Sequence, residues 1–149
     1  MGEHQVNKIT NTEEKTIYID QLLKDIEALD HMLKQGMFEN QPIHIGAEQE
    51  FCLVNDIWEP SDLGVEILAE IKDKHFTSEL NRYNLELNLD PVKLEGTSFS
   101  DLHNELNELL EKAKEAAAKH DAKIILTGIL PTVSERHLDY KYMTPVKRY

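Results

Sequence analysis

The chain has 149 residues, enough for one domain with a sizeable hydrophobic core, and its formal net charge is −12, from 28 Asp and Glu against 16 Lys and Arg. Because nucleic-acid binding and attachment to anionic membranes both depend on basic side chains, this charge argues against both kinds of partner. An acidic site would attract divalent metal ions instead, although most of these charges are expected to serve ordinary solubility.

Cysteine content and hydropathy bear on the compartment. Cys52 is the only cysteine, so an internal disulfide is excluded, and its apolar neighbours predict a buried, inert thiol rather than a nucleophile. No apolar run approaches the about 20 residues that span a bilayer, and the polar N-terminus lacks the apolar core of a signal peptide. These features favour a reducing, cytoplasmic environment.

The first half of the chain predicts a tail, a helix, a strand and a second helix. Residues 1–12 are polar and expected to be a disordered tail. Residues 13–35 predict an amphipathic helix, and Gly36 is a plausible stop. A strand over 43–54 and a helix over about 62–74 follow. The apolar face of the first helix consists of Ile19, Leu22, Leu23, Ile26, Leu29, Met32 and Leu33.

The second half predicts an acidic strand, a long helix and a short strand. The strand lies within 76–91 and ends at Asp90-Pro91, the helix is capped by Ser98 or Ser100 and runs to His120, and the strand covers 122–127. The helix buries Leu102, Leu106, Leu109, Leu110, Ala113 and Ala117. Its solvated face, which is not expected to bind a metal, carries Glu105, Glu108, Glu111 and Glu115. Together the elements predict an α+β domain over residues 13–149, with helices packed on one face of an antiparallel sheet.

Acidic residues gather on one face of each acidic strand. Since side chains alternate along a strand, Glu48 and Glu50 share a face, and Glu86, Asn88 and Asp90 share a face of the later strand. Carboxylates this close repel each other unless they are exposed, protonated or next to a cation. A solvent-facing sheet edge is the simpler alternative for the first pair. A row of Asn, Glu and Asp is a poor strand former, and oxygen ligands around Mg²⁺ would compensate.

Several of these stretches resemble the glutamate–cysteine ligase family 2, the carboxylate–amine ligases. Gly46-Ala47-Glu48-Gln49-Glu50-Phe51 is similar to the family's Gly-x-Glu-x-Glu-Phe strand, and the run 79–91 is similar to its Glu-Leu-x-x-x-x-Leu-Glu-x-Asn-x-x-Pro segment. Two shorter pieces, Thr127-Gly128-Ile129-Leu130-Pro131 and Arg148-Tyr149, resemble its Gly-x-x-Pro turn and its Arg-Tyr pair. The resemblance implies a fold like the catalytic domain of glutamine synthetase and a role in glutathione biosynthesis.

The resemblance also implies a reaction and a set of site residues. Family members join an amino acid's carboxylate to an amine through an acyl phosphate made with ATP and Mg²⁺ or Mn²⁺, and need no covalent nucleophile. The resemblance makes Glu48, Glu50, Glu79 and Glu86 the metal ligands. Glu79 and Glu86 are seven residues apart, so one regular strand would separate them, and a bulge or a helical turn over 78–83 would be needed to bring them together.

Two further residues have open roles. Asn88 either binds substrate or pairs with a neighbouring strand, and Arg148 either binds a carboxylate or phosphate or lies on the surface. Family enzymes are much longer, so this chain is expected to be the N-terminal part of a catalytic domain, inactive alone and able to form homo-oligomers, with small amino acids as substrates. The rival hypothesis is a non-catalytic acidic α+β module for protein interaction or divalent-metal binding. A glycosidase-type carboxylate pair ranks last, because two acids on one strand point at one spot.

Overall fold

The computed structural model describes residues 6–146 and divides them into two compact units, one ending at Ile43 and the other covering His44–Pro145. The expected disordered tail lies partly outside the described residues, and residues 6–11 form neither helix nor strand. The described elements are three α-helices and two antiparallel sheets, which confirms the predicted α+β class.

The first unit contains helix α1 (Thr12–Lys34). It begins where Asn11 caps it, because the Asn11 side chain accepts a hydrogen bond of 2.9 Å from the Glu14 backbone N–H. The predicted apolar stripe is present on this helix, yet α1 buries none of its side chains. The apolar side chains of α1 therefore form no hydrophobic core within this unit.

The second unit is built around a four-stranded antiparallel sheet in the order β3-β4-β2-β6. Its strands are β3 (Phe76–Ser78), β4 (Asn84–Asn88), β2 (Glu48–Val54) and β6 (Lys123–Ile125). A separate pair joins β1 (His44–Ile45) to β5 (Val92–Lys93). The strand predicted over 43–54 is thus interrupted at Gly46-Ala47, between β1 and β2.

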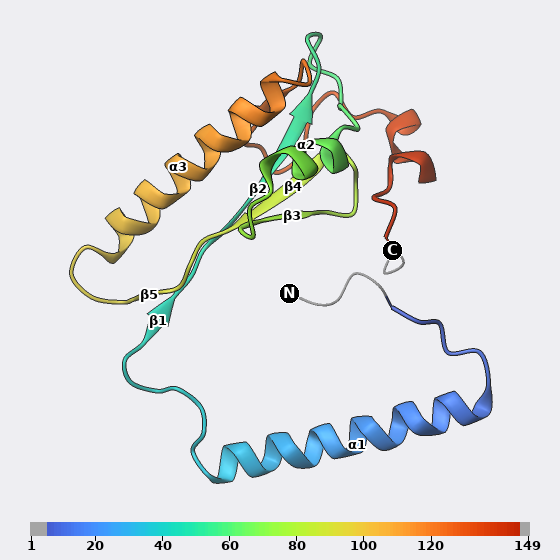
Figure 1. The fold of residues 1–149 in the computed structure, drawn as a ribbon, viewed down its shortest axis with the longest axis vertical. Coiled ribbons are helices and arrows are strands. Elements are labelled where there is room, and N and C mark those ends of the chain that lie inside the picture. Colours follow the sequence, from blue (N-terminus) through green and yellow to red (C-terminus); the bar gives the residue numbers. More distant parts are fainter. Residues whose placement is uncertain (1–5, 147–149) are drawn as a thin grey trace. The chain divides into compact units, whose positions relative to one another are not determined.

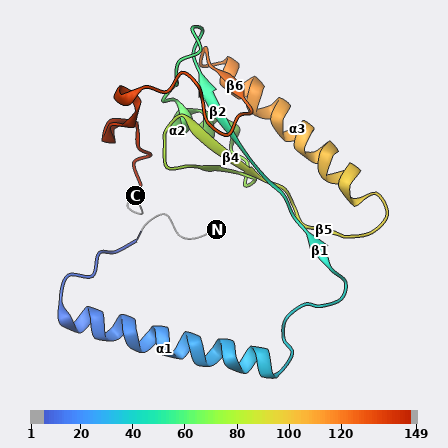
Figure 2. The ribbon, with the colours of Figure 1, turned by 180° about the vertical axis from the view of Figure 1, so that it is seen from behind.

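Helices α2 (Gly64–Ile71) and α3 (Ser98–Ala118) cover one face of the four-stranded sheet (Figures 1 and 2). The alternation of β2 and β4 points Phe51, Leu53, Leu85 and Leu87 into this layer, where all four are fully buried. The helices add Ile67, Ile71, Leu102, Leu109, Leu110, Ala113 and Ala117 to the same core. The prediction that helices pack on one face of the sheet is therefore confirmed for α2 and α3.

Details at the helix ends differ from the sequence prediction. Helix α3 is preceded by Thr97 as its N-cap residue, and the Thr97 hydroxyl donates to the Asp101 carboxylate at 2.9 Å. The expected caps Ser98 and Ser100 therefore lie inside the helix, because the chain turns one residue earlier, after Gly96 with φ of +53°. Helix α2 is shorter than the range 62–74, since Lys72 adopts the left-handed conformation that ends it.

The other face of the sheet changes character along its strands. At one end Cys52 and Val54 are buried under Leu130, with Ile125 and Val133 packed beside them. At the other end β2 carries Glu48 and Glu50, with the acidic residue of β4 alongside. Among the described residues, neither apolar cluster includes side chains that cover this acidic end. The polar side chains there are therefore able to form a site.

Candidate metal centre

Pairing of β2 with β4 brings the predicted acidic residues onto one face. The antiparallel register sets Glu50 opposite Glu86 and Glu48 opposite Asn88. Directly opposite residues project to the same side with Cβ atoms about 4.5–5.5 Å apart. The predicted shared face of Glu48, Glu50 and Glu86 is confirmed, but among the described residues Glu48 is not in the group of carboxylates close enough to bind one ion.

Glu79 reaches the same face through a hairpin. The chain turns at Asn81–Tyr83, so β3 and β4 pair antiparallel with Thr77 opposite Glu86. The Glu79 backbone N–H continues the ladder by donating to the Asn84 carbonyl at 3.4 Å. Since Thr77 and Glu79 are two residues apart, Glu79 lies on the face that carries Glu86. The expectation of a bulge or a helical turn is wrong: the two acids belong to two paired strand segments.

The carboxylates of Glu50, Glu79 and Glu86 form a compact group, which we call the glutamate cluster. One oxygen from each lies within 4.8 Å of the other two. Glu50 is exposed, Glu79 is half-buried and Glu86 is buried with 9% of its surface accessible. Each member comes from a different strand or its extension, so the sheet itself sets their spacing.

Burial and electrostatic repulsion within the cluster both act on the pKa of Glu79. Burial raises the pKa of the Glu79 carboxyl above its ordinary value, and the negative charges of Glu86 and Glu50 raise it further. Among residues 6–146, no lysine or arginine forms an ion pair with any of the three carboxylates. The cluster therefore holds negative charge that the described residues do not neutralise.

Asn88 orients one member of the cluster. Its side-chain amide donates to Glu86 Oε1 at 2.8 Å, from two residues along the same strand face. The amide thereby holds one Glu86 oxygen and leaves the carboxylate in a defined direction. This role was not anticipated from the sequence, although the spacing of two residues in an alternating strand is the signal that could have indicated it.

Glu48 lies outside the glutamate cluster and beside a pocket. It lies opposite Asn88, and this pair is the next one along the same face of β2 and β4 from the pair of Glu50 and Glu86. The two side chains border a cavity of about 370 Å³, whose lining residues are Gly46, Ala47, Glu48, Asn88, Leu89 and Pro91. Asn88 thus connects the cluster to a space large enough for a small polar molecule.

The donor set of the cluster fits a hard divalent cation. Mg²⁺ binds oxygen atoms at about 2.1 Å in an octahedron, so opposite oxygens of its shell are about 4.2 Å apart. Any three ligands of such a shell include at least two pairs that are about 3.0 Å apart. The cluster's oxygens lie within 4.8 Å of one another, so rotations of the three glutamate side chains would bring them closer around the ion. Carboxylate oxygens are also the donors that Mg²⁺ and Mn²⁺ prefer.

Two of the predicted residues remain, Arg148 and Cys52. Arg148 lies outside the described residues. Cys52 is 3% exposed, and burial together with the charge of Glu50 raises the pKa of its thiol, so the predicted inert thiol is confirmed as a buried one. Its Sγ donates to the Asn84 side chain at 3.5 Å.

Over the residues that the structure describes, none of the helices has the length and apolar character needed to cross a membrane. Comparison of this chain with protein-family models, curated proteins and solved structures gives no match.

Proposed function

We propose that the glutamate cluster is the divalent-cation site of an ATP-dependent carboxylate–amine ligase resembling glutamate–cysteine ligase. The observation that carries the proposal is the convergence of Glu50, Glu79 and Glu86 from three strand segments to within 4.8 Å, without a basic partner among the described residues. The family resemblance of the same residues supports the choice of reaction. The proposed substrates are small amino acids such as glutamate, and the proposed compartment is the cytoplasm.

The proposed reaction explains why a sheet would gather three carboxylates. Bringing the phosphates of ATP to a substrate carboxylate places anions side by side, and bound Mg²⁺ or Mn²⁺ would supply the positive charge that offsets this repulsion. In this arrangement Glu50, Glu79 and Glu86 hold the cation, and Asn88 keeps Glu86 in place through its 2.8 Å hydrogen bond. Glu48 and Asn88 border the adjoining cavity, where a small substrate would bind.

The first test of this proposal is metal binding by the purified chain. Mg²⁺ or Mn²⁺ should raise the thermal midpoint, because a cation that binds only the folded state stabilises it. Glu50→Gln and Glu86→Gln should remove most of that rise, whereas Glu108→Gln, an exposed carboxylate on α3, should retain it. An identical rise in all four proteins would refute the site.

The second test addresses the reaction itself. The longest natural form that contains this chain should release phosphate from ATP only when an amino acid and an amine acceptor are both present, and Glu86→Gln should abolish that release. Screening amino-acid pairs would identify the two substrates. Metal binding without any amino-acid-dependent phosphate release in that form would retain the cation site and reject the ligase.

The exposed apolar stripe of α1 favours a second candidate, a non-catalytic interaction module. Leu23, Ile26 and Leu33 on this helix are each more than half exposed, at 55%, 55% and 62%. An apolar helix face of this kind is typical of a surface that binds another protein. A variant that lacks the glutamate cluster but keeps α1 intact tests this candidate. If that variant still binds a partner protein, the interaction module is favoured over the ligase.

A further inference from the structure

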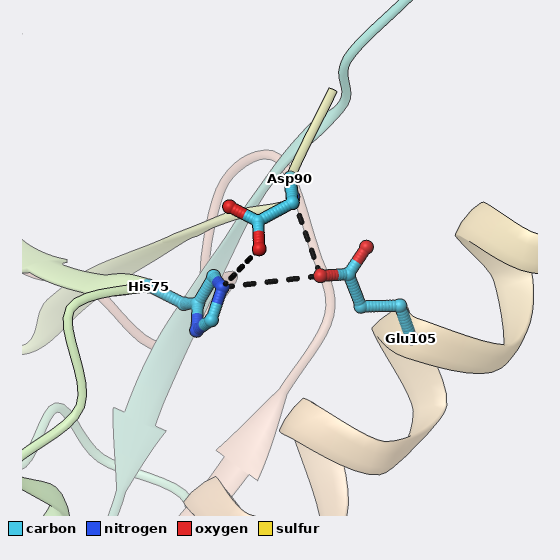
Figure 3. Close-up of side chains that lie close together, drawn as sticks. All are labelled: His75, Asp90 and Glu105. Carbon is cyan, nitrogen blue, oxygen red and sulfur yellow. Dashed lines mark hydrogen bonds and ion pairs between the residues drawn. The ribbon is translucent and has the colours of Figure 1, made fainter. Parts of the chain in front are cut away.

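A second cluster of possible metal ligands lies apart from the glutamate cluster. It consists of His75, just before β3, Asp90, just after β4, and Glu105 on α3, and we call it the histidine cluster (Figure 3). One ligand atom from each residue lies within 4.8 Å of the other two. The cluster shares no residue with the proposed ligase site, so it is independent of that proposal.

The imidazole of His75 is held in a defined orientation. Its Nδ1 lies 2.6 Å from Asp73 Oδ1, and the other Asp73 oxygen accepts from the Lys112 ammonium at 2.6 Å. Because an N–H must donate to a carboxylate, this contact puts a proton on Nδ1 and directs Nε2 towards Asp90 and Glu105. A carboxylate that fixes the remote nitrogen of an imidazole is the usual support of a metal-binding histidine.

The Nε2 atom of His75 lacks a satisfying partner in the protein. It is shielded from solvent and makes no hydrogen bond with another described group. Asp90 Oδ2 at 3.3 Å and Glu105 Oε1 at 3.9 Å are at ion-pair distances only. A buried polar atom without a partner destabilises the folded chain, so a ligand bound between these atoms would recover the lost free energy.

The two carboxylates are themselves positioned by other contacts. The Lys74 ammonium donates to both oxygens of Asp90, to Oδ1 at 3.1 Å and to Oδ2 at 3.4 Å, and Oδ2 also lies 3.3 Å from His75 Nε2. Glu105 Oε1 accepts from the Asp90 backbone N–H at 3.3 Å, and its side chain is only 26% exposed. The expectation that Glu105 belongs to the solvated face of the long helix is therefore wrong, because α3 packs this residue against the end of β4.

The geometry points to a binding site for a divalent transition metal, with His75 Nε2, Asp90 Oδ2 and Glu105 Oε1 as the ligands. Tetrahedral ligands at about 2.1 Å from Zn²⁺ are about 3.4 Å apart, which compares with the separations of 3.3 Å and 3.9 Å from Nε2. An imidazole with two carboxylates selects Zn²⁺ or a similar ion over Mg²⁺, which prefers oxygen donors alone. The metal would fasten helix α3 to the β3–β4 hairpin, since the three ligands come from these elements.

The experiment is a Zn²⁺ titration of the whole chain by calorimetry, accompanied by the visible absorption of Co²⁺, whose intensity reports tetrahedral coordination. The parent should bind Zn²⁺, and His75→Gln and Glu105→Gln should weaken binding by more than about 10-fold. Asp73→Asn, which weakens the support of the imidazole and the Lys112 ion pair but leaves the three ligands in place, should weaken it by about 10-fold. The matched controls are His103→Gln and Glu108→Gln, both exposed residues of α3.

Two further variants separate this site from the glutamate cluster. Glu50→Gln and Glu86→Gln should leave Zn²⁺ binding and the Co²⁺ spectrum unchanged. The proposal is overturned if the parent binds no Zn²⁺, or if His75→Gln and Glu105→Gln bind it as the parent does. Should His75→Gln fail to fold by circular dichroism, Glu105→Gln decides, because glutamine keeps the size of the Glu105 side chain and can still accept from the Asp90 backbone N–H. Unchanged Zn²⁺ affinity with a lower thermal midpoint would identify the cluster as an ion-pair network instead.

Discussion

Replacing Glu50 with glutamine should stabilise the metal-free chain, because it removes repulsion from the glutamate cluster. The Glu50 carboxylate lies within 4.8 Å of those of Glu79 and Glu86. Two unit charges at this distance repel by about 0.9 kcal/mol in water and by about 3.5 kcal/mol at an effective dielectric constant of about 20. Since Glu50 is exposed, the lower figure applies, and two such pairs give about 1–2 kcal/mol.

The expected gain in the thermal midpoint is roughly 3–8 °C for a domain of this size, measured by circular dichroism or calorimetry in chelator. Adding Mg²⁺ or Mn²⁺ should raise the midpoint of the parent and have little effect on Glu50→Gln. Glu48→Gln should produce a smaller gain, since Glu48 faces Asn88 outside the cluster. If both Glu50→Gln and Glu86→Gln were less stable than the parent in chelator, these carboxylates would be structurally paired and the reasoning would be refuted.

Four further outcomes are expected. Gly64→Ala should destabilise the chain by about 1–3 kcal/mol in urea titrations, because the added Cβ would lie 2.4 Å from the Arg82 carbonyl oxygen; Gly128→Ala, in open space, is the control, and equal stability of the two variants would contradict the packing. Cys52, whose thiol pKa is raised by burial, should be alkylated far more slowly at neutral pH in the native chain than in denaturant, and equal rates would disprove its burial. The parent should self-associate in light scattering through the exposed stripe of α1, and Leu29→Lys should reduce this; a parent that stays monomeric at micromolar concentrations would count against it. The 149-residue chain alone should show no glutamate-dependent ATP hydrolysis, since no basic group accompanies the cluster among the described residues, and phosphate release would show the opposite.

The face-sharing of the acidic residues could be predicted because it depends on local alternation. The period of two in β2 and β4 places Glu48, Glu50 and Glu86 on their faces without knowledge of the fold. Alternation alone does not place Glu79, because residues 79 and 86 lie in two paired strand segments and not in one strand with a bulge or a preceding helical turn. In a hairpin the pairing register decides which residues share a face, and a turn at Asn81–Tyr83 gives no strong signal in the sequence.

The histidine cluster could not be found by inspecting one segment at a time. His75 precedes and Asp90 follows the β3–β4 hairpin, so they are distant in sequence and meet only at its open end, and Glu105 is one of several glutamates at helical spacing on α3. Helical periodicity separates the buried face from the remainder but does not show which exposed position meets a neighbouring strand end. Only the packing of α3 against the sheet distinguishes Glu105 from Glu108.

The apolar stripe of α1 was predicted correctly as a pattern, but its burial was not realised within its unit. Amphipathic periodicity indicates that a helix has an apolar face and does not identify what covers that face. The sequence therefore predicted which face of the sheet is acidic and that α2 and α3 pack on the other face. Contacts between segments that are distant in sequence are visible only in the structure.

The most direct test of the central claim is a Mn²⁺ titration read by the loss of the electron paramagnetic resonance signal of the free ion. It should be carried out in a His75→Gln background, so that the histidine cluster does not contribute. The account predicts saturable Mn²⁺ binding that disappears when Glu50→Gln and Glu86→Gln are combined and persists with Glu108→Gln. Undiminished Mn²⁺ binding by the combined variant, or no binding by the His75→Gln protein that retains all three glutamates, would contradict a metal site at the glutamate cluster.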